Sequence, residues 1–130
     1  MKLMNREKIL IIEDDPDISS ALKMRLTSVG YRPEVVERGE EAVNFVAVHP
    51  PDLVILDIKL PDMSGYDVCR LLRKQCQPWE LPVMMLTAAD DMKSQLNGFA
   101  TGADAYLTKP YQAAELLKTV RLLLGKEGLN

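Results

Sequence analysis

The sequence predicts an α/β fold built on a parallel sheet with helices on both faces. Short apolar runs rich in β-branched residues alternate five times with segments whose apolar residues recur at helical spacing. The clearest run, Asp52–Asp57, places four consecutive apolar residues directly before a carboxylate. Such a run is typical of a strand buried on both faces, which belongs in a parallel sheet covered by helices.

The first half of the chain predicts three strands and two helices. Lys8–Ile12 is an apolar run that ends in Glu13-Asp14-Asp15, and Pro16 then suits the first turn of a helix. That helix is expected to run to about Val29, with Gly30 as its stop. A short strand within 31–37 leads to a helix at about 40–48, which His49-Pro50-Pro51 ends because proline cannot continue it. The strand that ends at Asp57 follows.

The second half predicts two more strands and three helices. Ser64 can cap a helix that carries Val68, Cys69, Leu71 and Leu72. A fourth strand is expected at 82–87, and the helix after it from Asp90 or Asp91 to about 101–102. A short fifth strand at 105–107 is followed by Lys109-Pro110 and by a last helix at about 113–124.

This alternation implies right-handed crossovers and a doubly wound five-stranded sheet. The expected strand order is 2-1-3-4-5, a flavodoxin-like arrangement of three layers, α/β/α. In this order the first and third strands are neighbours at the point where the winding reverses. Ligands bind at the carboxyl ends of the strands at such a point, and both of these strands end in acidic residues.

Length and composition limit the possible classes. The 130 residues suit one domain, with a core over about 8–124 and residues 125–130 as a tail or the start of a linker. The net charge of −3 and the absence of a basic stripe argue against direct contact with nucleic acid. No apolar run reaches the length of a membrane span or of a signal-peptide core. Cys69 and Cys76 lack metal-ligand spacing, and so low a cysteine count fits a reducing compartment.

Glu13, Asp14 and Asp57 are expected to converge at the carboxyl edge of the sheet. Each ionised pair would repel by roughly 4 kcal/mol at 4 Å with an effective dielectric constant near 20. Such a cluster must take up protons or hold a cation, and a few hard oxygen ligands suit Mg²⁺. The alternative is a solvated acidic rim at helix N-termini, where carboxylates are mildly favoured.

Thr87, Tyr106 and Lys109 are expected at or near the same edge. A lysine and a hydroxyl beside carboxylates and a metal ion would neutralise the oxygens of a phosphoryl group, and phosphoryl transfer needs little more. Asp57 could then act as the nucleophile, because a carboxylate can form an acyl phosphate. Taken singly, each of these residues is ordinary: a lysine after a strand is usually exposed, and threonine is a common strand residue.

Together these residues resemble the receiver domain of two-component response regulators, over about 8–124. Four stretches carry the resemblance, in the order in which the family has them. They are Glu13-Asp14-Asp15-Pro16, the stretch from Asp57 through Lys59-Leu60-Pro61-Asp62 to Gly65, Thr87-Ala88, and Gly102-Ala103-Asp104-Ala105-Tyr106-Leu107-Thr108-Lys109-Pro110.

The resemblance implies a role for each site residue. Asp57 would accept a phosphoryl group from a histidine kinase or phosphotransfer protein, so the domain would be a phosphoacceptor and not a turnover enzyme. Mg²⁺, for which Mn²⁺ can substitute, would be held directly by Asp14 and Asp57, by the backbone carbonyl of Lys59, and through water by Glu13. Lys109 would pair with the phosphoryl oxygens.

The resemblance also implies a switch and a cellular setting. Thr87 and Tyr106 would form a switch pair, read out on the surface of the fourth helix, fifth strand and fifth helix. The Lys109-Pro110 bond would be cis, and the location cytoplasmic. Asp15 matches a variable position and is expected to start the helix.

Some features depart from the family, and some alternatives remain. Winged-helix regulators of the family tend to have an acidic pair before the fifth-strand aromatic and an arginine in the last helix. Here Ala105 follows Asp104, and Thr119 occupies the arginine position, so their salt-bridged dimer is not implied. The chain would be either a stand-alone receiver or part of a longer protein with an output domain.

Three other functions compete. A flavin or nucleotide binder would need a phosphate loop where Glu13-Asp14-Asp15 stands. An aspartyl-phosphate hydrolase would need a second acid at the position of Lys59. The remaining alternative is a fold-only interaction module that phosphorylation does not regulate.

Overall fold

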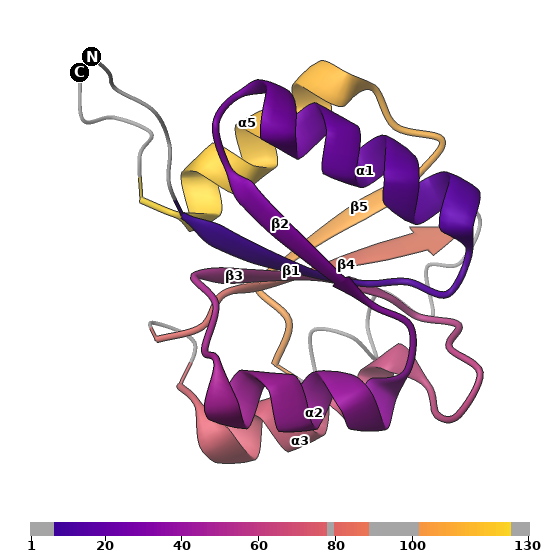
Figure 1. Ribbon diagram of the computed structural model, residues 1–130, viewed down its shortest axis with the longest axis vertical. Coiled ribbons are helices and arrows are strands. Elements are labelled where there is room, and N and C mark those ends of the chain that lie inside the picture. Colours follow the sequence, from indigo (N-terminus) through magenta and orange to yellow (C-terminus); the bar gives the residue numbers. More distant parts are fainter. Residues whose placement is uncertain (1–6, 78–79, 89–101, 126–130) are drawn as a thin grey trace.

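A five-stranded parallel sheet of order β2-β1-β3-β4-β5 forms the centre of the protein (Figure 1). The computed structural model describes residues 7–77, 80–88 and 102–125. The strands are β1 (Lys8–Ile12), β2 (Arg32–Val36), β3 (Leu53–Asp57), β4 (Val83–Ala88) and β5 (Ala105–Lys109). The helices are α1 (Pro16–Ser28), α2 (Gly39–Val48), α3 (Gly65–Gln75) and α5 (Ala113–Leu123). The predicted class and strand order are confirmed; the helix predicted after β4 lies outside the described residues.

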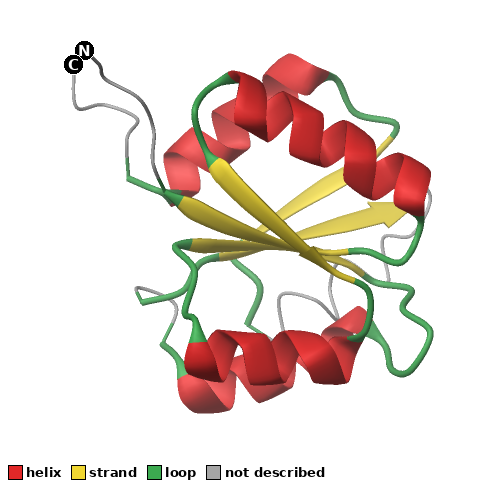
Figure 2. Ribbon diagram, viewed as in Figure 1, coloured by secondary structure: helices red, strands yellow, loops and turns green. Residues whose placement is uncertain are grey.

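The helices form layers on the two faces of the sheet, α1 and α5 on one face and α2 and α3 on the other (Figure 2). Alternate strand residues supply the two layers of the core, as the period of a strand requires. Ile9 and Ile11 pack in the cluster under α1 and α5, whereas Leu10 and Ile12 pack in the cluster above α2 and α3. All five residues of β3 are buried, as predicted for a central strand covered on both faces.

The helix ends follow the residues that the sequence marks. The Asp15 side chain caps α1 by accepting a hydrogen bond from the Asp17 N–H at 2.9 Å, and Pro16 is the first helical residue. Gly30 follows the end of α1 with a φ of 97°, a conformation that glycine adopts without steric cost. Ser64 caps α3 by accepting from the Tyr66 N–H at 3.1 Å. The caps made by Asp15 and Ser64 fix where α1 and α3 begin.

Two strand ends differ from the sequence prediction. β5 was expected to stop at Leu107, but it continues through Thr108 and Lys109. β4 likewise ends at Ala88, one residue later than predicted. The extension comes from parallel pairing between the two strands, in which Thr87 lies opposite Thr108. The apolar run of β5 does not show this extension, because its two added residues, Thr108 and Lys109, are polar.

Among the described residues, no helix combines the length and the apolar character needed to cross a bilayer.

The core of the sheet gives a direct test of the fold. Leu10 is 0% exposed and Met24 on α1 is 71% exposed. Leu10→Ala should lower the free energy of unfolding by about 3 kcal/mol, because a buried cavity replaces the side chain. Met24→Ala, the control, should change it by less than about 0.5 kcal/mol. Urea unfolding measures both; equal effects would contradict the packing described.

Candidate functional site

Three carboxylates meet at the carboxyl edge of the sheet. β1 and β3 pair with Ile12 opposite Leu56, so the acidic residues that follow or end these strands lie side by side. One carboxylate oxygen each from Glu13, Asp14 and Asp57 lies within 4.8 Å of the others. The Glu13 N–H also donates to the Val36 carbonyl at 3.0 Å, which ties this residue to β2. The convergence expected from the sequence is therefore present.

Glu13 is the most deeply buried acid of the cluster, at 2% exposure. Its Oε2 accepts a hydrogen bond from the Asp15 N–H at 3.1 Å, whereas its Oε1 is buried with no hydrogen-bond partner. Burial, aided by the negative charge of Asp57, raises the pKa of Glu13 to about 7. A buried carboxylate oxygen without a donor is the kind of group that a cation or a proton satisfies.

Asp57 faces a positive charge on its other side. The Lys109 ammonium lies 3.1 Å from Asp57 Oδ1, and Asp57 is only 9% exposed. This pair joins the end of β3 to the end of β5 across β4. The Asp57 carboxylate is thus held between two acids and one lysine, with its direction fixed by the lysine.

Thr87 and Tyr106 occupy neighbouring strands near this pair. The Thr87 hydroxyl is buried, and its Oγ1 has no hydrogen-bond partner. Tyr106 is partly buried and packs against the apolar cluster on the α2 and α3 face. The Lys109-Pro110 peptide bond is cis, as the resemblance implies. Thr87 therefore offers an unused polar group at the site, while Tyr106 lies in an apolar setting.

The loop that follows Asp57 carries Lys59, whose side chain is exposed. A bridge between Lys59 and Ser64 and a hydrogen bond of 2.6 Å from the Gly65 N–H to the Ile58 carbonyl close the loop. Asp62, at its tip, accepts hydrogen bonds from two backbone N–H groups of α2. Its pKa is lowered, chiefly by the hydrogen bonds from Glu40 and Gly39.

The contacts of Asp62 were not predicted. No local pattern indicates them, because the partner residues are 22 and 23 positions away in the chain. The partner of Asp104 was not predicted either. This residue pairs with Arg73 of α3 at 2.7 Å and accepts from the Val83 N–H at 2.8 Å. It thus ties α3 to the start of β4.

The donor set fits a hard divalent cation. Three carboxylates lie together, one of them paired with Lys109, and all the ligand atoms that the cluster offers are oxygen atoms, the ligands that Mg²⁺ and similar ions prefer. The unpartnered Oε1 of Glu13 supports the same conclusion. The arrangement identifies a class of ion and not one metal.

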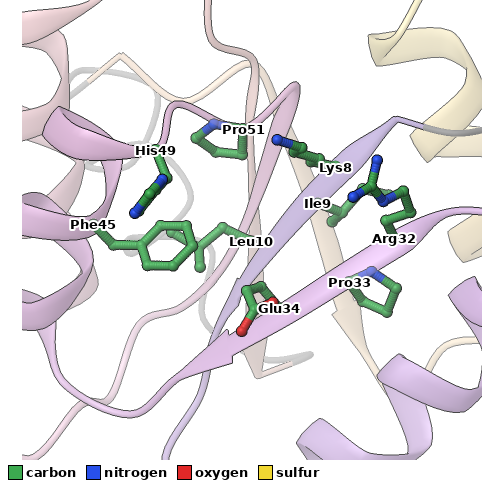
Figure 3. A pocket seen from close by; sticks show the side chains of 9 residues that line it. All are labelled: Lys8, Ile9, Leu10, Arg32, Pro33, Glu34, Phe45, His49 and Pro51. Atoms are coloured by element: carbon green, nitrogen blue, oxygen red, sulfur yellow. The ribbon is translucent and has the colours of Figure 1, made fainter.

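A separate pocket of about 340 Å³ lies at the opposite edge of the sheet (Figure 3). Lys8 and Arg32, the first residues of β1 and β2, line it, and so do Phe45 and His49 at the end of α2. The acids of the cluster instead follow or end their strands. This pocket is therefore not part of the candidate site.

Comparisons with known proteins agree on one family. The profile described as "Response regulator receiver domain" matches residues 9–121. A response regulator from Chloroflexus aurantiacus has a solved structure with a TM-score of 0.86 and 34% identity, covering 93% of this chain and 99% of that one. The receiver domain of a sensor histidine kinase from Pseudomonas aeruginosa has a TM-score of 0.85 and 30% identity, with the same coverage, and is described with magnesium coordinated in its active-site cleft.

Curated relatives are longer proteins. The DNA-binding dual master transcriptional regulator RpaA of Synechocystis is 40% identical over 119 residues, which cover 92% of this chain and 49% of that protein. The phosphate regulon regulatory protein PhoB of Rhizobium meliloti is 38% identical, with 92% and 52% coverage. The chain spans about half the length of the curated relatives that it matches.

The raised pKa of Glu13 predicts a pH dependence of stability without a divalent cation. Between pH 4.5 and about 7, Glu13 ionises in the unfolded chain but stays protonated in the folded one. The folded state then binds more protons, so stability falls as the pH rises through this window, by no more than about 3 kcal/mol.

Glu13→Gln should remove this contribution, because glutamine does not ionise. Urea unfolding in chelator at pH 4.5 and pH 8 should show the variant gaining stability relative to wild type at the higher pH. A difference between the two proteins that stays constant with pH would contradict the assignment.

Proposed function

The chain belongs to the response regulator receiver domain family, and from this premise we propose that Asp57 accepts a phosphoryl group from a histidine kinase or phosphotransfer protein. An Asp57 carboxylate oxygen would attack the phosphorus of a phosphohistidine. A P–O bond forms, the P–N bond breaks, and the histidine nitrogen keeps the electron pair. The main support is the setting of Asp57, which is 9% exposed, beside two acids and 3.1 Å from the Lys109 ammonium.

The cation that we propose for the acidic cluster is Mg²⁺, for which Mn²⁺ can substitute. Asp14, Asp57 and the Lys59 carbonyl would bind the ion directly, and Glu13 would act through water. When bound, the ion would offset negative charge on the carboxylates and the phosphoryl oxygens. The magnesium ion described for the Pseudomonas receiver domain supports this choice.

The neighbouring residues would bind and sense the phosphoryl group. Lys109 already pairs with Asp57, and it would shift part of that contact to the added oxygens. Thr87 has a buried hydroxyl with no partner, and a phosphoryl oxygen would supply one. Movement of Thr87 would leave space for Tyr106, so that the surface of β5 and the flanking helices reports phosphorylation. Asp57 would accept one phosphoryl group per protein molecule, so the domain would act as a phosphoacceptor and not as a turnover enzyme.

The output would be an effector domain in a longer protein or a separate target. RpaA is described as a DNA-binding regulator, and the chain matches about half of it. The acidic domain itself would not contact nucleic acid. A cytoplasmic location follows from the proposed kinase partner. No observation favours the alternative of an unregulated interaction module.

Asp57→Asn tests the proposed acceptor. The amide cannot form an acyl phosphate, so base-labile labelling from acetyl phosphate with Mg²⁺ should fall to background. Asp17→Asn, which changes an exposed acid on α1, serves as the matched control and should be labelled like wild type. Undiminished labelling of Asp57→Asn would disprove the assignment.

Thr87→Ala tests the proposed switch. The variant should still accept phosphate, but amide exchange in β5 and α5 should respond less to beryllofluoride and Mg²⁺ than in wild type. Thr87→Ser keeps the hydroxyl and should retain the response. An equal response in the alanine variant would remove Thr87 from the signalling path.

A further inference from the structure

The N-terminus of α2 is capped by a residue from a distant loop. Arg38 holds the N-cap position with an extended backbone, but its side chain makes no capping hydrogen bond. The Asp62 carboxylate takes this role: Oδ1 accepts from the Gly39 N–H at 2.8 Å and Oδ2 from the Glu40 N–H at 3.0 Å. Both oxygens are therefore engaged, and the first free N–H groups of the helix are satisfied.

The loop that carries Asp62 is also held at its base, against Asp57. The Gly65 N–H bonds the Ile58 carbonyl at 2.6 Å, and Lys59 bridges to Ser64. A Cβ atom at Gly65 would lie 2.5 Å from the Asp57 backbone oxygen. The end of the loop thus returns to direct contact with the backbone of Asp57.

The tip of the loop packs against α2 as closely as the base of the loop packs against Asp57. A Cβ atom at Gly39 would lie 2.5 Å from the Met63 Cγ, so the neighbour of Asp62 fills the space over the helix end. A carboxylate near a helix N-terminus is also favoured by the helix dipole. Base and tip together leave the loop between Asp57 and α3 little freedom.

We propose that Asp62 is a positioning residue for the phosphorylation site. By holding the loop tip on α2, it would fix the backbone that carries the Lys59 carbonyl, which is one of the oxygens proposed to bind the cation. The inference rests on the proposed function, because it concerns how well that site holds its cation. Contacts that orient metal ligands without touching the metal commonly change affinity by tenfold or more.

Asp62→Ala should weaken Mg²⁺ binding about tenfold by calorimetry, and slow labelling from acetyl phosphate under subsaturating Mg²⁺. The Gly65 amide, which closes the loop, should exchange faster in the variant. The matched control is Asp67→Ala, which removes an exposed carboxylate from the first turn of α3, where it pairs with Arg70. This variant should bind Mg²⁺ as wild type does.

A second variant separates positioning from simple loss of helix stability. Arg38 already has the extended conformation of a cap, so Arg38→Ser in the Asp62→Ala background can give α2 a cap of its own. The double variant should regain melting temperature, while its Mg²⁺ affinity stays about tenfold below wild type. It also keeps the test valid where the single variant folds poorly.

The outcomes distinguish the two proposals. Wild-type protein that binds no Mg²⁺ and accepts no phosphate would overturn the proposed function, and the positioning role with it. Wild-type protein that does both, beside a double variant with unchanged or restored Mg²⁺ affinity, would overturn only the role of Asp62.

Discussion

Mutual repulsion among three carboxylates at one edge of the sheet is the constraint on which the site depends. β1 and β3 are adjacent, and β3 is buried along its whole length, so the residues at their ends cannot move apart without breaking the sheet. The free-energy cost of ionising an acid in this cluster is clearest at Glu13, because burial and the charge of Asp57 raise its pKa to about 7. The fold therefore keeps a local instability that a cation or a proton relieves.

Elements far apart in the sequence complete the site around this cluster. β5 extends two residues beyond its apolar run, to Lys109. This extension places the Lys109 ammonium 3.1 Å from Asp57 Oδ1. The loop after Asp57 is closed on itself and then capped onto α2 by Asp62. Lys109 thus balances the charge of Asp57 from one part of the chain, and Asp62 holds the loop after Asp57 by contacts with another part.

The sequence carries the part of this arrangement that depends on local pattern. Apolar runs that end in acid predict β1, β3 and the edge at which Glu13, Asp14 and Asp57 meet, and Asp15 and Ser64 predict helix starts. Contacts with no local signature were not predictable. In the sequence Asp62 is an ordinary loop acid, because its partners on α2 are far away along the chain. Asp104 belongs to a stretch that resembles the family, but nothing beside it in the sequence indicates its ion pair with Arg73 of α3. The polar end of β5 follows from pairing with β4, not from its own residues.

Two buried polar atoms, Glu13 Oε1 and Thr87 Oγ1, have no hydrogen-bond partner, and together they suggest how the site could work as a switch. Leaving such a group unsatisfied costs about 1–3 kcal/mol. A ligand shifts a conformational equilibrium only by its differential interaction with the two states. A cation would satisfy the glutamate, and a phosphoryl oxygen on Asp57 would satisfy the threonine only if Thr87 moves toward it. About 2 kcal/mol gained in this way changes the ratio of two conformations roughly thirtyfold. Because the Thr87 hydroxyl has no partner before phosphorylation, the added phosphoryl group would change the packing around Thr87 as well as the charge of the site.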